Sequence, residues 1–353
     1  MKILEEGLRE GVFPFARTCV LHQGREVISD GNAPDEMVFD LASVTKVMAT
    51  TALCLDLVKL GALQLSTSVI GVTVEDLLFH RSGLAAFKPF FVEALGAWPQ
   101  LHDAGCPPDA RAAARAHVVA AAQTSPVSAR KAAVYSDIGF IVLGELLAKA
   151  GGAPLDALFI RHVSEPLGLS SAGYRRISSA LPAPLYVAAT GATRPREPAP
   201  GQEGMWNVAT KPTRPAEVDD DNAWAMDGVS GHAGLFGTAR DVAKYGQAVL
   251  EGRFAPPEGR SWSPDRATPD STRTLGFDTP SAEGASCGPR FGKKGPKGAI
   301  GHLGFTGTSL WIDFDRELVV ALCTNRVALG RANVKIREYR PRFHEAVLDQ
   351  LGL

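Results

Sequence analysis

Three short segments of the chain contain residue types that can carry out nucleophilic catalysis. The first is Ser43-Val44-Thr45-Lys46, in which a serine and a lysine stand three positions apart. On a helix such residues share a face, with Cβ atoms about 5–6 Å apart. A serine hydroxyl is a weak nucleophile until a base removes its proton, and a lysine whose pKa is lowered by burial can be that base. The spacing therefore indicates a lysine-activated serine; the alternative is a helix N-cap serine beside an unrelated lysine.

The second segment, Tyr135-Ser136-Asp137, directly precedes an apolar run at 138–150 that predicts a helix. A tyrosine can relay protons when a nearby cation stabilises its phenolate, and a lysine could supply that cation. In the structural alternative, Asp137 is the helix N-cap and Tyr135 is a core aromatic residue.

The third segment, residues 301–308, reads Gly-His-Leu-Gly-Phe-Thr-Gly-Thr and leads into a predicted strand. Glycines beside a strand edge allow a substrate to lie against the backbone, and exposed N–H groups there can stabilise an oxyanion. The alternative is a glycine-rich turn before a hairpin.

Hydrophobic periodicity predicts the elements that must position these segments. The predicted helix at 42–60 is apolar nearly all round, which indicates burial on most sides. Thr73 can cap another helix that ends near Gly83. The remaining predicted elements are helices at 2–10, 110–123, 138–150 and 331–351, and strands at 15–23, 26–29, 308–313 and 318–324.

Strands at both ends of the chain with helices between them predict an α/β protein of the α+β type. We expect one antiparallel sheet built from the N- and C-terminal segments, flanked by helices, with an inserted, mostly helical region. Length alone suggests about two domain-sized units. We interpret 1–353 as a single domain, with the sheet region at about 1–60 and 232–353 and the helical region at about 61–231. A Pro-rich stretch at 182–222 and a Gly/Pro-rich stretch at 253–300 predict long surface loops rather than elements, and such loops are often functional rims.

Composition narrows the classes of partner and cofactor. The 37 basic and 38 acidic residues give a net charge of −1, which removes the electrostatic argument for nucleic acid or an anionic membrane as partner. No apolar run reaches the ~18 residues of a membrane span, and the N-terminus lacks a signal-peptide pattern, so the sequence predicts a cytoplasmic protein, or a periplasmic one if the start is truncated. The five cysteines form no C-x-x-C pair, and the histidine spacings predict no metal site. We expect no cofactor, and nothing indicates an oligomeric state.

The three segments occur in the order found in one family of enzymes. Ser43-x-x-Lys46, Tyr135-Ser-Asp137 and His302-Leu-Gly304 resemble the motifs of the serine β-lactamase and penicillin-binding protein superfamily, especially its class C-like and esterase branch. Segments 39–46, 77–84 and 231–238 are similar to the same branch, and the likeness runs from about residue 10 to the last helix. The resemblance implies a β-lactamase/DD-peptidase-like fold.

The resemblance also implies a role for each matching residue. Ser43 would be acylated, and Lys46 and Tyr135 would share the proton transfers. The backbone N–H groups of Ser43 and Phe305 would form the oxyanion hole. Asp137, His302 and Gly304 would lie against the substrate, and water would release the acyl group.

Two departures from the family pattern bear on the substrate. Asp137 replaces the usual asparagine, which turns an amide donor into an acceptor that could pair with Lys46. His302 replaces the usual lysine, and a neutral imidazole near pH 7 attracts a substrate carboxylate poorly, although protonation near pH 6 could restore the charge. We therefore expect a carboxylic-ester hydrolase for small neutral esters or amides. The alternatives are a D-alanyl-D-alanine carboxypeptidase or β-lactamase, and a non-catalytic ligand-binding relative.

Three other features have structural interpretations. Ser286 lies in a G-x-S-x-G pattern, which in α/β-hydrolases needs a strand before it and a helix after it; here a Gly/Pro-rich loop surrounds it. We expect His232 to tie a turn and His80 to pack behind the site at the end of a helix.

Overall fold

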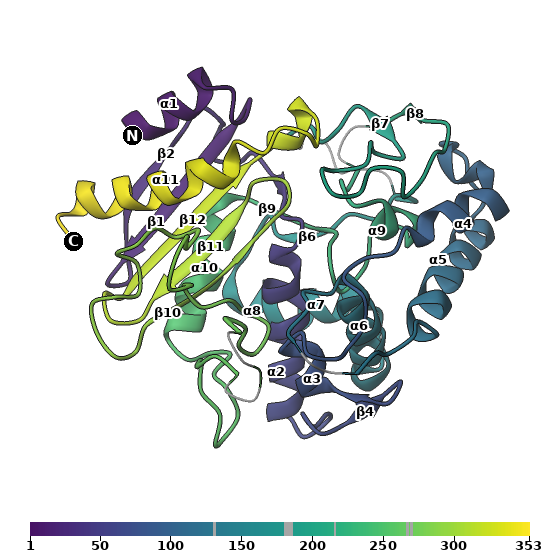
Figure 1. Cartoon of the computed structure of the whole chain (residues 1–353), viewed down its shortest axis with the longest axis horizontal. Coiled ribbons are helices and arrows are strands. Elements are labelled where there is room, and N and C mark those ends of the chain that lie inside the picture. The colour runs from purple at the N-terminus through teal and green to yellow at the C-terminus, as the bar shows by residue number, and fades with distance from the viewer. Residues whose placement is uncertain (130–131, 180–185, 215–216, 266–267, 269–270) are drawn as a thin grey trace.

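The computed structural model describes residues 1–129, 132–179, 186–214, 217–265, 268 and 271–353. Its main sheet has five antiparallel strands in the order β10-β11-β12-β1-β2. The strands are β1 (Ala16–His22), β2 (Arg25–Gly31), β10 (Ala299–Leu303), β11 (Ser309–Asp313) and β12 (Leu318–Thr324). The first and last strands of the chain, β1 and β12, are neighbours, which confirms a sheet assembled from both termini (Figure 1).

Helices cover both faces of this sheet. Successive side chains along each strand point to opposite faces, and the helices bury those on both faces. Val20 and Val320 face the pair formed by α1 (Lys2–Arg9) and α11 (Ile336–Leu351), whereas Cys19 and Val319 face α10 (Ala239–Leu250). In Figure 1, α1 and α11 lie side by side across the strands, and both chain termini are at that edge of the molecule.

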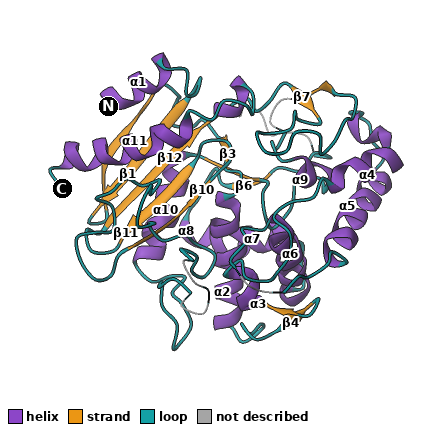
Figure 2. Ribbon diagram, in the orientation of Figure 1, coloured by secondary structure: helices purple, strands orange, loops and turns teal. Residues whose placement is uncertain are grey.

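The inserted region packs helices around a second part of the core (Figure 2). The π-helical turn η1 (Lys46–Thr51) continues directly into α2 (Ala52–Lys59), and every residue from Val44 to Leu57 is buried, whereas Ser43 just before them is partly exposed. The other helices are α3 (Val74–Leu78), α4 (Phe90–Ala97), η2 (Pro99–His102), α5 (Pro108–Gln123), α6 (Asp137–Gly151), α7 (Leu155–Phe159), η3 (Ile160–Ser164), α8 (Glu165–Leu167) and α9 (Asp221–Ala225), and η4 (Arg326–Leu329) follows β12.

Short strands connect the two regions next to the candidate residues. In a three-stranded sheet, β9 (Leu235–Gly237) pairs with β3 (Phe39–Asp40) and β6 (Gly173–Tyr174). This pairing places the segment just before Ser43 beside the segment just after His232. The remaining strands are β4 (Ser68–Val69) with β5 (Val72–Thr73) and β7 (Thr193–Arg194) with β8 (Lys211–Pro212).

Most predicted elements are confirmed; two differ in their bounds, and several elements, among them α4, α10 and β10, were not predicted. The Thr73 cap exists as a capping box with Asp76, but α3 ends at Leu78 rather than near Gly83. The last helix begins at residue 336 rather than 331. The sequence analysis missed β10, because its alternation is short and two glycines surround His302 in a segment that also has the composition of a turn.

Among the described residues, no single helix is long and apolar enough to cross a membrane. One bent pair, Asp137–Gly151 with Leu155–Leu167, meets that criterion by length and composition, with an angle of 73° at the break. Over the same part of the chain, no group of three His, Cys, Asp or Glu side chains could hold a metal ion.

Helix α6 and the segment around Gly231 approach each other closely at a pair of glycines. A Cβ atom added to Gly144 would lie 2.9 Å from both the Cα and the N of Gly231, closer than real Cβ contacts. Because backbone atoms cannot move aside as a side chain can, a methyl group there must separate α6 from the 230–234 segment.

We predict that Gly144→Ala lowers the free energy of unfolding by about 1–3 kcal/mol through this overpacking. Gly96→Ala is the matched control, since Gly96 is exposed in α4 and nothing lies within 4 Å of its added Cβ. The control should raise stability by roughly 0.5–1 kcal/mol through helix propensity. Urea denaturation measures both; equal effects would contradict the close approach.

Candidate active site

Ser43 lies at the start of the buried helical segment and contacts Lys46 directly. The ammonium Nζ of Lys46 donates to Ser43 Oγ at 3.0 Å, as the spacing predicts. The preceding residue, Ala42, has φ +47°, a conformation unusual for a residue with a Cβ. Its N–H donates to Asp40 Oδ1 at 2.8 Å, which helps to hold the backbone in that conformation. The candidate nucleophile therefore sits on a constrained turn.

Lys46 is completely buried, and its three ammonium protons each have an acceptor. Besides Ser43, Nζ donates to Asp137 Oδ1 at 2.6 Å and to the carbonyl oxygen of His232 at 3.0 Å. Burial alone lowers the pKa of Lys46, but the charge of Asp137 and the contact with Tyr135 raise it more, so the pKa ends above its usual value of 10.5. The resting site therefore contains an ammonium ion.

This result corrects one step of the sequence analysis. Burial was expected to lower the pKa of Lys46 and make it a ready base, but the Asp137 carboxylate outweighs burial. The predicted pairing of Asp137 with Lys46 is confirmed.

Tyr135 completes the group around Ser43. Its hydroxyl is close enough to interact with both Lys46 and Ser43, and Lys46 Nζ lies 4.8 Å from the centre of its ring. Burial raises the pKa of Tyr135, and the nearby ammonium lowers it by less. The His80 ring, 4.7 Å from that of Tyr135, accepts a hydrogen bond from Ser136 N at 3.0 Å. His80 thus packs behind the site, as expected.

The structure separates the roles of Ser136 and Asp137. Ser136 is the N-cap of α6, because its side chain accepts from Gly139 N at 3.1 Å. The N-cap interpretation of Asp137 is therefore wrong. Asp137 is the first helical residue, and its side chain is free to reach Lys46.

The backbone N–H groups of Ser43 and Phe305, which border the cavity, have no acceptor among the described residues. The turn that carries Phe305 is tied to the segment before Ser43, since Thr306 Oγ1 donates to Asp40 O at 2.7 Å and Thr308 Oγ1 to Leu41 O at 3.1 Å. A Cβ at Gly304 would lie 2.6 Å from Leu41 O, so only glycine permits this approach. The arrangement suits an oxyanion hole.

His302 lies on β10 with its ring 5.9 Å from that of Tyr135. Its Nδ1 is 2.9 Å from the carbonyl oxygen of Leu303, so Nδ1 carries the proton. Burial, together with the charges of Lys46 and Arg273, holds the pKa of His302 well below 6.5. The expectation that His302 becomes protonated near pH 6 is therefore wrong, and its side chain stays neutral across the physiological range.

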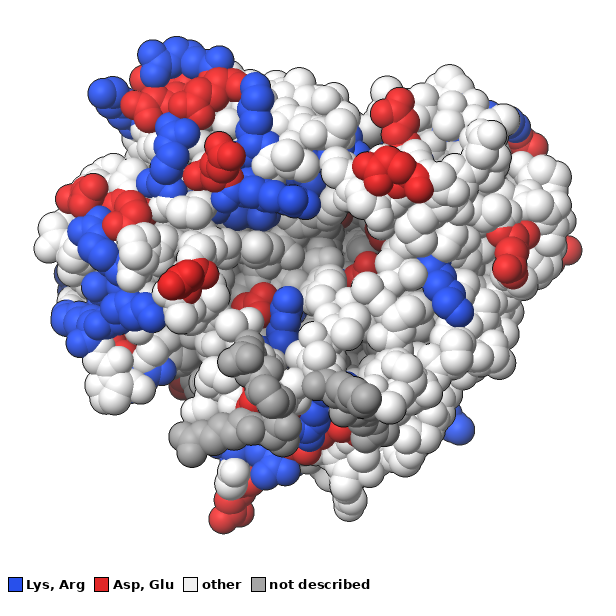
Figure 3. All heavy atoms as spheres, in the orientation of Figure 1, with Lys and Arg blue, Asp and Glu red and all other residues white. Residues whose placement is uncertain are grey.

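A cavity of about 350 Å³ joins these residues, and the molecule is hollowed near the centre of the face shown in Figure 3. Its walls include all the sequence-predicted site residues except the buried Lys46: Ser43, Tyr135, Asp137, His302, Gly304 and Phe305. The loop at 253–300, predicted as a functional rim, contributes Arg273, whose NH1 pairs with Asp278 at 2.7 Å.

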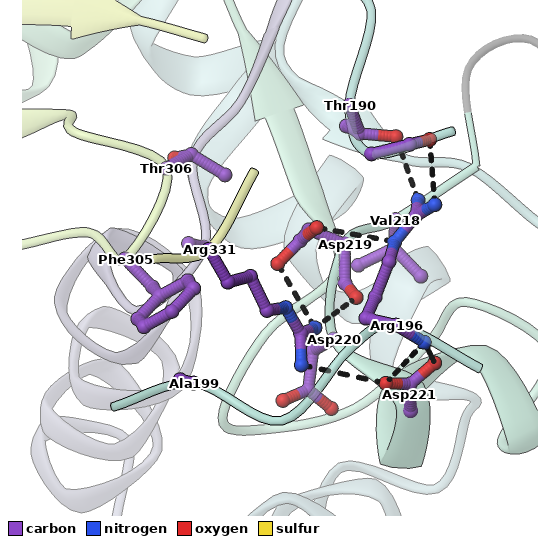
Figure 4. Close-up of polar contacts among 12 residues, drawn as sticks. Thr190, Arg196, Ala199, Val218, Asp219, Asp220, Asp221, Phe305, Thr306 and Arg331 are labelled. Atoms are coloured by element: carbon purple, nitrogen blue, oxygen red, sulfur yellow. Dashed lines mark hydrogen bonds and ion pairs between the residues drawn. The ribbon is translucent and has the colours of Figure 1, made fainter. Parts of the chain in front are cut away.

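Sequence reasoning missed a buried network of acidic and basic residues along another wall (Figure 4). Arg331 NH2 lies 3.0 Å from Asp219 Oδ2, and Arg196 Nε lies 3.1 Å from Asp219 Oδ1. Arg331 also lies 3.5 Å from Asp221. Asp220 accepts from His232 Nε2 at 2.9 Å, and Ser230 Oγ lies 2.8 Å from His232 Nδ1, so His232 ties the turn at 230–232 to the start of α9.

The interpretation of 182–222 as a surface loop is therefore wrong in part, because Arg196, Asp219 and Asp221 are almost fully buried. Residues 182–185 and 215–216 of that stretch lie outside the described residues. A run of three aspartates was the available signal, but their arginine partners are distant in sequence.

Comparison with known proteins identifies the family. A family model described as Beta-lactamase matches residues 2–341. The chain belongs to the beta-lactamase family. Membership makes it a relative of serine hydrolases, and the predicted resemblance and fold class are confirmed.

Individual relatives of this beta-lactamase family member have several activities in their names. An N-acetylmuramyl-L-alanine amidase of Bacillus subtilis (strain 168) is 29% identical over 318 residues, or 82% of this chain and 68% of the amidase. A protein of Salmonella agona (strain SL483) named as a D-alanyl-D-alanine carboxypeptidase is 30% identical over 213 residues, or 58% of this chain. That match spans 47% of the carboxypeptidase, about half its length.

A solved structure similar in fold is that of EstCE1, described as a hydrolase with promiscuous acyltransferase activity. It superposes with a TM-score of 0.63 at 18% identity, covering 96% of this chain and 97% of EstCE1.

The Asp137–Lys46 contact predicts a pH effect. Asp137→Asn removes the negative charge that raises the pKa of Lys46, so the deprotonated base becomes available at lower pH. When the rate at which a fluorophosphonate modifies Ser43 is plotted against pH, we expect the rising limb of the curve to move about 1–3 units towards lower pH in this variant. Asp103→Asn, at an exposed carboxylate paired loosely with Lys211, is the control and should leave the limb in place. A limb that stays or moves up in Asp137→Asn would contradict the assigned electrostatics.

Proposed function

We propose that the protein is a serine hydrolase that forms an acyl-enzyme on Ser43 and acts on small neutral esters or amides. The observation that carries the proposal is the contact of Ser43 Oγ with the buried Lys46 and with Tyr135, beside two backbone N–H groups without a described acceptor. A non-catalytic relative would not need this arrangement, because binding alone requires neither a proton relay nor an oxyanion hole.

The geometry supports the following acylation step. The Lys46–Tyr135 pair first releases one proton to solvent, because the resting ammonium ion, which donates all three of its protons, has no lone pair to accept another. The hydroxyl of Ser43 then passes its proton to the pair as Oγ attacks the substrate carbonyl carbon. The carbonyl oxygen becomes an oxyanion, which the N–H groups of Ser43 and Phe305 can stabilise. As the bond to the leaving group breaks, the pair returns the proton to the departing oxygen or nitrogen.

Deacylation follows the same route with water as the nucleophile. Water gives its proton to the pair and attacks the ester carbon of the acyl-enzyme, and Ser43 Oγ takes the proton back as it leaves. Each turnover therefore returns the Lys46–Tyr135 pair to the deprotonated form from which acylation began.

The preference for neutral substrates rests on the charges beside Ser43. His302 is neutral, Asp137 is committed to Lys46, and Arg273 is committed to Asp278. None of the three is an unpaired cation that would hold a substrate carboxylate, as the family's usual lysine at the His302 position would.

The second candidate is a carboxypeptidase or β-lactamase activity. The name of the Salmonella relative favours it, and so do the additional arginines in the cavity wall, Arg326, Arg331, Arg337 and Arg340. The two candidates share the chemistry of Ser43 and differ in whether the substrate carries a carboxylate.

Covalent labelling tests the nucleophile. A fluorophosphonate should add to Ser43, and Ser43→Ala should lose both the label and ester hydrolysis. Ser286→Ala is the control for the G-x-S-x-G pattern, which the structure places in a loop, and it should keep both. Peptide mapping that finds the adduct on Ser286, or an active Ser43→Ala, would contradict the mechanism.

The ratio of two substrates tests the preference. For the wild type, kcat/KM for short p-nitrophenyl esters should exceed that for nitrocefin, and the ratio should stay flat from pH 8 to 6 because His302 remains neutral. His302→Lys should lower the ratio of kcat/KM for the ester to kcat/KM for nitrocefin by roughly 5–30-fold, the equivalent of ~1–2 kcal/mol of charge attraction. His22→Lys, at the end of β1, is the control and should not change it. A wild type that prefers nitrocefin would establish the second candidate.

A further inference from the structure

The C-terminal helix α11 places a buried arginine against the turn that carries the free Phe305 N–H. Arg340 is 5% exposed, and its NH2 donates to the carbonyl oxygens of Gly304 at 2.7 Å and Thr308 at 2.9 Å. Arg340 forms no ion pair with any carboxylate in the described part of the chain. Burying a cation without a carboxylate partner lowers the stability of the fold, and an apolar side chain could fill the same space with a smaller loss of free energy. Packing alone therefore does not explain why an arginine occupies this position.

The reason lies in the peptide group that Arg340 contacts. The carbonyl of Gly304 and the N–H of Phe305 belong to the same peptide unit. The carbonyl oxygen accepts two hydrogen bonds, one from Arg340 and one from Gly307 N at 3.0 Å. The N–H end has no acceptor among the described residues and borders the cavity with Ser43. The unit is therefore saturated at its acceptor end and available at its donor end.

Hydrogen bonds to a carbonyl polarise the whole peptide and strengthen the N–H of that unit as a donor, by about 10–30% per bond. A cationic donor has about twice the strength of a neutral one. The gain grows when the N–H faces a full negative charge, so it favours the oxyanion of the transition state over the neutral carbonyl of the substrate.

We propose that Arg340 is a positioning residue for the oxyanion hole: it fixes the 304–305 peptide and polarises it so that Phe305 N–H stabilises the oxyanion. Arg326 supports the next peptide of the same turn, since its Nε donates to Phe305 O at 2.7 Å. The inference rests on the proposed acyl-enzyme chemistry and adds to it a residue about 300 positions from Ser43.

The test compares Arg340→Gln, which keeps a neutral donor, with Arg340→Lys, which keeps the charge. Each variant is assayed with a neutral p-nitrophenyl ester and with nitrocefin, and its thermal unfolding is measured. We expect Arg340→Gln to lower kcat about 10–100-fold on both substrates with KM changed less than about threefold, since losing a whole oxyanion donor costs about 10²–10³-fold. Arg340→Lys should recover part of this loss. Arg342→Gln, on the outer face of α11 where Arg342 pairs with Glu10, is the matched control and should keep wild-type kinetics.

Three results would overturn the proposal. An unchanged kcat on the ester with a raised KM for nitrocefin alone would make Arg340 an anchor for substrate carboxylates. A loss of kcat that follows the loss of thermal stability, with no recovery in Arg340→Lys, would make its role structural only. Unchanged kinetics in a folded Arg340→Gln would remove it from the reaction. Labelling of Ser43 in the wild-type protein tests the acyl-enzyme separately, because it involves no Arg340 variant. If the label adds to Ser43, each of these three results contradicts the role of Arg340 and leaves the acyl-enzyme in place.

Discussion

The rest of the site depends on one buried ammonium ion. Lys46 is shielded from water, and its three acceptors come from Ser43, from Asp137 at the start of α6 and from the backbone of His232. A buried charge left unpaired costs several kcal/mol, so these three segments must stay together for the fold to be stable. The same requirement brings the nucleophile, the carboxylate that controls proton affinity and the edge of the cavity into contact.

Hydrogen bonds from side chains to the backbone hold the opposite side of the site. The turn at 304–308 is joined to the segment before Ser43 by two threonine hydroxyls, and Gly304 is needed because the chains run so close there. On the other wall, arginines bridge the aspartates at 219 and 221. The cavity thus lies between rigid supports, which suits a reaction whose oxyanion donors must be in place before charge develops.

The sequence predicted those parts of the fold and site that depend on local pattern. Alternating and periodic apolar residues located most strands and helices, and the three motifs identified Ser43, Lys46, Tyr135, Asp137, His302, Gly304 and Phe305, which the structure gathers around one cavity. What the sequence could not supply was the balance of opposing effects. Burial lowers the pKa of Lys46 while Asp137 raises it, and only the 2.6 Å contact shows which effect is larger.

Long-range partners were also beyond the reach of sequence patterns. Asp219 and Arg331 are 112 residues apart, and Arg340 and Gly304 are 36 residues apart. The start of α6 was also assigned wrongly from sequence, which took Asp137 as the N-cap; the side-chain geometry assigns the cap to Ser136.

The protonation state of Lys46 is the most direct test of this account. With ¹⁵N-labelled lysine, and with Lys46→Arg to assign the resonance, NMR can follow the Nζ signal of Lys46 between about pH 6 and 11. The account predicts an ammonium signal that persists above the usual lysine pKa of 10.5, because Asp137 and Tyr135 outweigh burial. A neutral amine at pH 7 would contradict it, since the lysine would then be a ready base and the contact with Asp137 would not control the chemistry of Ser43.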